Sequence, residues 1–216
     1  FTQADINASA AAIRYLNYET YLEDFFKKFI EITHNQKDTI YIFYSDHGSG
    51  ISQKDYEAIM GIETTSENAE ENLKKYRQEM IKTIAFIYAP DDNDTSLGVK
   101  KGLLKGVQPR VRSQVDIYRT IVELFDLKTD NYYFGTNLLS KEHTFAIDTR
   151  NFNIVTDDYF IMGKKMAWKN KIEKSILRLN NTPMIEPVDV FDYVSRFKKK
   201  MDQALSENAY QYLKNN

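Results

Sequence analysis

The hydrophobic positions near the start of the chain predict a long helix followed by a strand. Between residues 7 and 34 the apolar side chains recur mostly at steps of three and four, which is the stripe of an amphipathic helix. They are Ile13, Leu16, Leu22, Phe25, Phe26, Phe29 and Ile30. A polar turn at 35–38 leads into residues 39–44, a short β-branched and aromatic run. Such a run is typical of a strand buried on both faces, as in a parallel sheet.

The same patterns continue along the rest of the chain and predict an α/β protein. Short apolar pieces in 144–168, with Gly163 at a hairpin turn, indicate a small antiparallel patch. The stretch 91–101 is polar and predicts a surface loop. The other predicted elements are a helix at 66–82 with Ser66 as N-cap, a buried strand at 83–90, a helix at 113–127 and a long C-terminal helix at 188–213 that follows Pro187.

Composition narrows the class of protein. The 216 residues carry 29 Lys and Arg against 31 Asp and Glu, a net charge of −2, which argues against a strongly basic nucleic-acid-binding protein. No apolar run approaches the roughly 18 residues needed to cross a bilayer, and no signal peptide is evident. Cysteine is absent, so neither a thiol nucleophile nor a Cys-ligated metal is available. The chain begins at Phe1, and we expect it to be processed or cut from a longer protein.

The strongest candidate for chemistry is the tripeptide Asp46-His47-Gly48. Ligands of open α/β sheets bind beyond the carboxyl ends of the strands, and these residues follow the run at 39–44. A carboxylate beside an imidazole offers two metal ligands, and Gly48 and Gly50 let the backbone turn sharply. On the tripeptide alone we favour a simpler interpretation, in which Asp46 caps a backbone N–H and His47 is a surface residue.

Several phrases resemble those of one family. Residues 42–48 resemble the metal-binding Asp-His step of the alkaline phosphatase and sulfatase superfamily. They are most similar to its lipoteichoic acid synthase branch, with Ser45 in place of a glycine. The resemblance covers roughly residues 8–170. Its other phrases, in the family's order, are 13–16, 113–121 with Arg119 where the family usually has proline, 134–140, and 149–162.

The resemblance implies a fold and a reaction. It places residues 1–143 in the C-terminal part of a sulfatase-like α/β/α sandwich, and residues 144–216 in a small antiparallel region with a long C-terminal helix. It implies a divalent metal, commonly manganese, held in part by Asp46 and His47. A threonine nucleophile, which forms a covalent phospho-enzyme, and the remaining ligands are expected upstream of this chain. We therefore expect the chain alone to be inactive.

The resemblance also implies partners and a location. The substrate is expected to be lipid-linked phosphoglycerol or a related anionic molecule, and the missing N-terminal half of the catalytic domain is an expected partner. We expect the protein to lie at the extracytoplasmic face of the cell membrane, held there by a segment absent from this chain, or to be secreted after cleavage. A sulfatase, a phosphoethanolamine transferase and a non-catalytic scaffold that binds a polymer or partner remain alternatives.

His143 and the two downstream family phrases are open to both functional and structural interpretations. His143 is a candidate for the rim of a substrate site, although a solvated loop histidine is the simpler interpretation. Gln114 and Asp116 are expected to start and cap a helix. Gly135 is expected to supply a tight turn.

Overall fold

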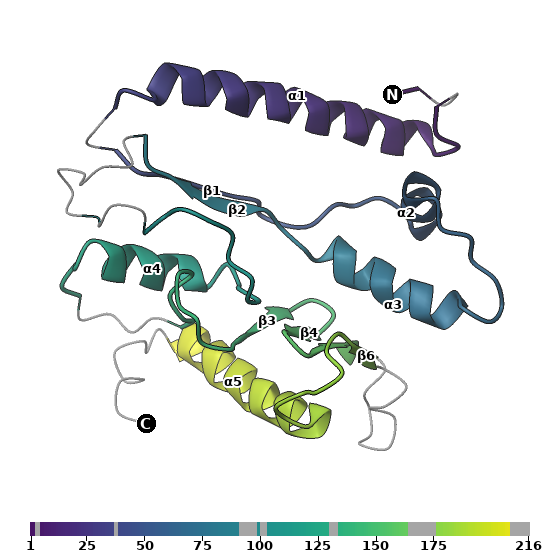
Figure 1. Cartoon of the computed structure of the whole chain (residues 1–216). Coiled ribbons are helices and arrows are strands. Elements are labelled where there is room, and N and C mark those ends of the chain that lie inside the picture. The colour runs from purple at the N-terminus through teal and green to yellow at the C-terminus, as the bar shows by residue number, and fades with distance from the viewer. Residues whose placement is uncertain are drawn as a thin grey trace. The chain divides into compact units, whose positions relative to one another are not determined.

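The computed structural model of the chain describes residues 1–2, 5–36, 39–90, 99, 103–129, 134–163 and 176–207 (Figure 1). It forms two compact units, Phe1–Leu104 and Lys105–Asn216, each of which is described by itself. Helices and small antiparallel sheets alternate, and a long helix lies near the C-terminus, which confirms the predicted α/β class. Among the described helices, none is both long and apolar enough to span a bilayer.

The first unit contains three helices and a two-stranded sheet within its described residues. The elements are α1 (Ala10–Thr33), β1 (Tyr41–Tyr44), α2 (Gln53–Met60), α3 (Ala69–Met80) and β2 (Ala85–Tyr88). The strands are antiparallel, with Tyr41 opposite Tyr88 and Tyr44 opposite Ala85. The parallel, doubly buried arrangement that we predicted is therefore wrong, since the strand residues are half-buried or exposed. An aromatic run indicates a strand but does not determine its direction.

Aromatic rings form the packing between α1 and this sheet. Phe26 meets Phe43 and Phe86 edge-on, with ring centroids 5.2 and 5.1 Å apart. Phe29 meets Phe43 at 5.2 Å, and Phe43 stacks on Phe86 at 4.6 Å. Edge-to-face and offset pairs are the favoured geometries of aromatic side chains. This is the packing expected of the helical stripe around Phe26 and Phe29.

One carboxylate joins the beginnings of two helices. Ser9 caps α1, and its N–H donates to Asp55 Oδ1 at 2.6 Å. Ser52 caps α2, and its hydroxyl donates to Asp55 Oδ2 at 2.8 Å. We did not predict α2, although Ser52 and the left-handed Gly61 (φ 63°) are the signals of its two ends. The predicted helix at 66–82 is shorter than expected and is preceded by Asn68 rather than Ser66.

The second unit is built on a four-stranded antiparallel sheet in the order β3-β4-β5-β6. Its elements are α4 (Asp116–Leu124), β3 (Phe145–Asp148), β4 (Asn153–Thr156), β5 (Tyr159–Ile161), β6 (Ile176–Arg178) and α5 (Pro187–Glu207). The sheet confirms the predicted antiparallel patch. The helix α5 begins at Pro187, and the predicted continuation to residue 213 lies outside the described residues.

Gly163 follows β5, at the start of the connection to β6, and these two strands pair antiparallel. The segment 164–175 lies outside the described residues, so the hairpin turn at Gly163 stays a prediction. A Cβ at Gly163 would lie 1.9 Å from the carbonyl oxygen of Phe152, so the glycine is needed for a close approach of two backbones.

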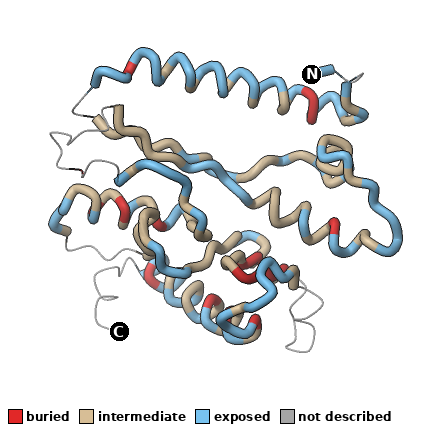
Figure 2. The backbone as a smooth tube through the Cα atoms, viewed as in Figure 1, coloured by how far each residue is buried: buried red, intermediate tan, exposed pale blue. Residues whose placement is uncertain are grey.

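A cluster of buried apolar residues joins this sheet to α5 (Figure 2). Ile154, Tyr159 and Ile161 from the sheet and Val194 from α5 have no exposed surface. Val190, one helical turn before Val194, belongs to the same cluster. This side of α5 matches the apolar stripe that predicted the helix.

The boundary between the two compact units lies between Leu104 and Lys105. Hydrogen bonds explain why 105–143 folds with the C-terminal region. Gln108 donates to the carbonyl of Leu138 at 2.6 Å, and the N–H of Val111 donates to Asp157 at 2.7 Å. The boundary that the family resemblance placed at residue 143 stays a prediction about the family's domains.

Candidate metal-binding site

Asp46 and His47 lie in the loop directly after β1. The N–H of Ser45 donates to the carbonyl of Ile84 at 3.0 Å, so the sheet ends one residue before Asp46. The Ser45 hydroxyl donates to the His47 carbonyl at 2.8 Å, and the His47 N–H donates to Asp46 Oδ1 at 2.9 Å. These bonds form the capped turn of the simpler interpretation, and they also bring the carboxylate and the imidazole together.

The contacts of His47 favour the tautomer that leaves Nε2 able to bind a metal. Its Nδ1 lies 2.8 Å from the carbonyl oxygen of Gly48. A carbonyl oxygen can only accept, so Nδ1 carries the proton and the neutral ring has its lone pair on Nε2. Metal-bound histidines usually donate their other ring N–H to such a carbonyl or to a carboxylate.

The two donor atoms are spaced for one cation. His47 Nε2 lies 3.5 Å from Asp46 Oδ2, and the two side chains are 79% and 84% exposed. Ligands bound at about 2.1 Å in tetrahedral geometry are roughly 3.4 Å apart. The pair therefore fits a divalent ion that approaches from solvent.

The end of α3 holds this loop. A Cβ at Gly48 would lie 1.9 Å from the carbonyl oxygen of Met80, so only glycine allows the contact. The Ser49 hydroxyl lies 3.0 Å from the Met80 sulfur, and the Tyr76 hydroxyl donates to the Ile51 carbonyl at 2.8 Å. These contacts could not be predicted from local sequence patterns, because they join residues about 25 to 30 positions apart.

We predicted that Gly48 and Gly50 let the backbone turn sharply, and the structure corrects this prediction. Neither Gly48 nor Gly50 has the positive φ that favours glycine. Gly48 is required by close packing, whereas a Cβ at Gly50 would meet nothing within 4 Å. The loop is thus shaped by its contact with α3 and not by a left-handed turn.

The described residues do not complete a metal site. Within them, no group of three or more His, Cys, Asp or Glu side chains lies close enough to hold an ion. Metal sites of enzymes normally use at least three protein ligands. Asp46 and His47 are therefore a pair of candidate ligands that needs partners from residues outside the described ranges.

His143 lies in the second unit and takes part in an ion cluster. Its Nδ1 is 2.7 Å from Asp157 Oδ2, and Arg110 Nη1 is 3.3 Å from the same oxygen. Asp157 also accepts from the Val111 N–H. The cluster fastens the loop at residue 143 to the turn between β4 and β5, which favours the structural interpretation. A role of His143 at a substrate rim stays a prediction.

Gly135 has the structural role that the sequence predicted, and Asp116 has it in part. Asp116 rather than Gln114 is the first residue of α4, and Val115 is the N-cap residue, without a side-chain cap bond. The Asp116 Oδ2 accepts from the Ser113 N–H at 2.7 Å, which holds the backbone before the helix. Its Oδ1 accepts from the Thr136 N–H at 2.8 Å. Gly135 has φ 90°, and a Cβ there would lie 2.5 Å from Asp116 Oδ1. The two family phrases are thus joined at one tight turn.

Arg119, which stands where the family usually has proline, fastens the same turn. Its Nη1 donates to the Gly135 carbonyl at 3.1 Å and its Nε donates to Glu123 at 2.6 Å. Hydrogen bonds from Arg119 and then Asn137 hold the pKa of the Glu123 carboxyl below its usual range. Arginine at this position therefore makes side-chain hydrogen bonds that a proline could not make.

Comparisons with known proteins agree with the resemblance. A family model described as Sulfatase matches residues 2–127, more than half of the chain. Lipoteichoic acid synthases of Staphylococcus aureus strains USA300, NCTC 8325 / PS 47 and COL are 27% identical over 220 residues, which cover 98% of this chain and 29% of each relative. The chain thus spans about three tenths of the length of the curated relatives it matches. No solved structure gives a significant match. With a family match that includes the loop of Asp46 and His47, the chain belongs to the Sulfatase family.

Proposed function

We propose that this chain supplies two metal ligands, Asp46 and His47, to an extracytoplasmic transferase that moves phosphoglycerol from a lipid donor to a glycolipid or teichoic acid chain. The similarity to lipoteichoic acid synthases supports the choice of reaction. The Sulfatase family match supports metal dependence. Manganese is the ion we propose.

One observation carries the proposal. The Nδ1–H of His47 is bonded to the Gly48 carbonyl, which leaves the Nε2 lone pair 3.5 Å from Asp46 Oδ2. A histidine used only for surface solvation needs neither that tautomer nor a carboxylate at that distance. This arrangement supports the assignment of both side chains as ligands of one ion.

The chain's own residues have limited and separate roles. Asp46 would supply negative charge to the ion and His47 a neutral nitrogen, while α3 keeps both in place through Gly48. A divalent cation bound there would polarise the phosphate and favour the deprotonated nucleophile. The nucleophile and the third ligand would come from outside the described residues.

The test uses the whole gene product that carries this sequence. We expect His47→Ala and Asp46→Asn to reduce manganese-dependent phosphodiester hydrolysis at least a hundredfold, because each removes a ligand and leaves the ion underligated. His34→Ala is the matched control, since His34 lies in the same unit, after the end of α1. Undiminished activity of His47→Ala would contradict the ligand assignment.

A second candidate reaction follows from the family match. Members of a family named for sulfatases can be expected to include enzymes that hydrolyse sulfate esters, so the same protein is assayed with an aryl sulfate and with a phosphodiester. Faster metal-dependent turnover of the phosphodiester supports phosphoglycerol transfer. Faster turnover of the sulfate ester would replace it with the sulfatase alternative while leaving Asp46 and His47 as ligands.

A further inference from the structure

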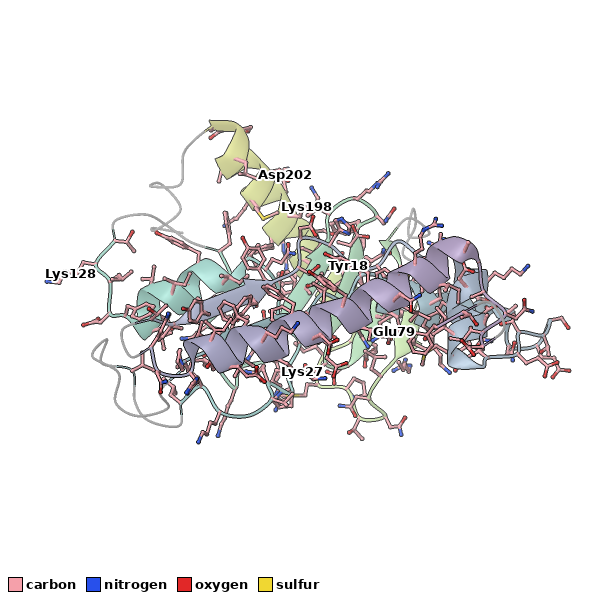
Figure 3. The ribbon with its side chains drawn as sticks, turned by 90° about the horizontal axis from the view of Figure 1, so that it is seen from above. Tyr18, Lys27, Glu79, Lys128, Lys198 and Asp202 are labelled. Carbon is pink, nitrogen blue, oxygen red and sulfur yellow. The ribbon has the colours of Figure 1, made fainter. Side chains whose placement is uncertain are left out.

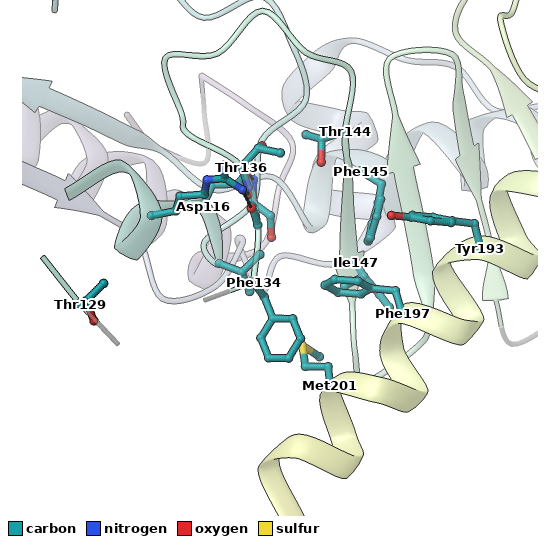
Figure 4. A pocket seen from close by; sticks show the side chains of 14 residues that line it. Asp116, Thr129, Phe134, Thr136, Thr144, Phe145, Ile147, Tyr193, Phe197 and Met201 are labelled. Carbon is teal, nitrogen blue, oxygen red and sulfur yellow. Dashed lines mark hydrogen bonds between the residues drawn. The ribbon is translucent and has the colours of Figure 1, made fainter. Parts of the chain in front are cut away.

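The second unit contains a pocket that the proposed function does not use. Its volume is about 480 Å³, within the range of roughly 300–1,000 Å³ typical of small-molecule sites. The start of α4, Thr129 and residues 135–136 line one side, and Phe134, β3 and α5 line the other (Figure 4). The two walls differ in chemistry, and that difference defines the ligand.

Charged side chains in the pocket already have partners. Both oxygens of Asp116 accept backbone N–H bonds, from Ser113 and Thr136. Arg119 is paired with Glu123 at 2.6 Å. An ionic ligand would have to displace one of these bonds, which is costly at the buried Asp116. The pocket therefore favours a neutral ligand.

The first wall is rich in hydroxyl groups. Ser113, Thr129 and Thr136 line it, and Thr144 adds a hydroxyl from the segment just before β3. Among the described residues, the buried Oγ1 of Thr136 has no hydrogen-bond partner. A buried hydroxyl without a partner is uncommon and costs stability. Rotation about χ1 would offer it to a ligand without breaking an existing bond, so this wall favours a ligand with hydroxyl or ether oxygens.

The opposite wall is aromatic and aliphatic. Phe145 from β3 meets Phe197 from α5 edge-on with centroids 5.1 Å apart, and Phe134 meets Phe197 at 5.5 Å. Tyr193 and Met201 extend the same wall along α5 (Figure 4). Such a surface packs against flat groups that carry C–H bonds. A pure alkyl chain would satisfy this wall but would leave the hydroxyl wall dehydrated and unpaired.

We infer that this pocket binds a neutral sugar ring. A pyranose presents C–H bonds on one face and hydroxyl groups around its edge, which matches the two walls and the pairing of Asp116 and Arg119. The inference concerns a site in the second unit and does not depend on the metal ligands of the first. Failure of the metal assignment therefore leaves it standing, and its own failure leaves the metal assignment unaffected.

The test is ligand-observed saturation-transfer NMR on the 216-residue chain without metal. The probes are methyl glucoside, glycerol, glycerol phosphate and hexanol. We expect saturation transfer to the ring protons of methyl glucoside and weaker or no transfer to the other three. Glycerol has the hydroxyls without the ring face, glycerol phosphate adds charge, and hexanol has only the apolar part.

Two variants locate the binding. Thr136→Val keeps the volume and the backbone bond to Asp116 but removes the unpaired hydroxyl, so we expect affinity to fall about five- to tenfold with unfolding unchanged. Phe197→Leu should weaken binding about three- to tenfold by removing the flat wall. Thr65→Val is the matched control, an exposed threonine of the first unit.

The outcomes are distinct. Sugar binding that both variants weaken and Thr65→Val does not supports the inference. Stronger binding of hexanol or of glycerol phosphate than of methyl glucoside overturns it in favour of an alkyl or an anionic ligand. Sugar binding that neither variant changes, or no sugar binding at all, also overturns it. If Phe197→Leu fails to fold, Thr136→Val still decides the question.

Discussion

The two units keep their apolar side chains from water to different degrees. In the second unit Ile154, Ile161 and Val194 are fully buried between a four-stranded sheet and α5. In the first unit the rings that pack α1 on its two-stranded sheet are only partly buried, and few described residues are buried. The candidate metal ligands lie in this less buried unit. Their geometry therefore depends on a small number of identifiable contacts.

The helix α1 shows the same contrast along its own surface. Tyr18, Tyr21 and Ile32 are 57%, 65% and 78% exposed, although all belong to the broad apolar side of the helix. Tyr18 and Lys27, nine residues apart, project from opposite sides of α1 (Figure 3). The apolar stripe of α1 is thus wider than the surface that two strands cover, whereas Val190 and Val194 of α5 are buried against its sheet.

The largest expected effect tests the difference in burial directly. Ile161→Ala removes a fully buried side chain, and we expect it to lower the free energy of unfolding by about 2–5 kcal/mol. Ile32→Ala makes the same chemical change at an exposed position, so its effect should stay within about 0.5 kcal/mol. Urea denaturation measures both. Equal effects would remove the contrast between the units.

A smaller effect tests how the ligand loop is held. Gly48→Ala forces a Cβ against the Met80 carbonyl, so we expect a loss of about 1–3 kcal/mol and displacement of Asp46 and His47. Gly50→Ala is the control, because its Cβ would meet nothing. Denaturation gives the free energy of each variant and two-dimensional NMR gives the loop shifts. Similar behaviour of the two variants would show that α3 does not hold the loop.

The next prediction concerns acid and the start of α1. Hydrogen bonds from the Ser9 N–H and then the Ser52 hydroxyl hold the pKa of Asp55 below its ordinary value of 3.8. A lowered pKa stabilises the folded state above the ordinary value, and this contribution is lost as the pH falls through the folded-state pKa. We expect amide protection at residues 9–12 to fall between pH 4 and pH 2 in the natural protein. In Asp55→Asn that pH dependence should be absent, and its persistence would contradict the role of Asp55.

The smallest effect is expected on the surface of α5. Lys198 and Asp202 form an ion pair one helical turn apart (Figure 3). Asp202 is 53% exposed, so Asp202→Asn should cost no more than about 0.5 kcal/mol and less at high salt. Thermal unfolding at two salt concentrations measures this. If Asp202→Asn lowered the free energy of unfolding more than Gly48→Ala does, the surface ion pair would matter more than the packing contact, against the prediction.

The sequence predicted the elements better than their pairing. Periodicity located α1, α4 and α5, and alternation located the sheet around β4 and β5. Strand direction could not be predicted, because residues 39–44 would look alike in a parallel or an antiparallel sheet. The helix α2 was missed because eight residues give little periodicity, and only its caps at Ser52 and Gly61 marked it.

For the candidate site, the sequence supplied the two residues and the structure supplied their geometry. Asp46 and His47 were singled out by their position after a strand and by a family phrase. The tautomer of His47 and the packing of Gly48 against Met80 depend on backbone positions that no local pattern contains. The pocket of the second unit could not be predicted for the same reason, since its walls come from five separate stretches of the chain.

One measurement tests the central claim most directly. Manganese is titrated into the 216-residue chain, and paramagnetic broadening of backbone amide signals is followed by two-dimensional NMR. We predict that the signals of residues 45–49 broaden first, that His47→Ala abolishes this preference, and that His34→Ala leaves it unchanged. Earlier broadening around His143 and Asp157, or broadening at 45–49 that survives His47→Ala, would contradict the assignment of Asp46 and His47 as metal ligands.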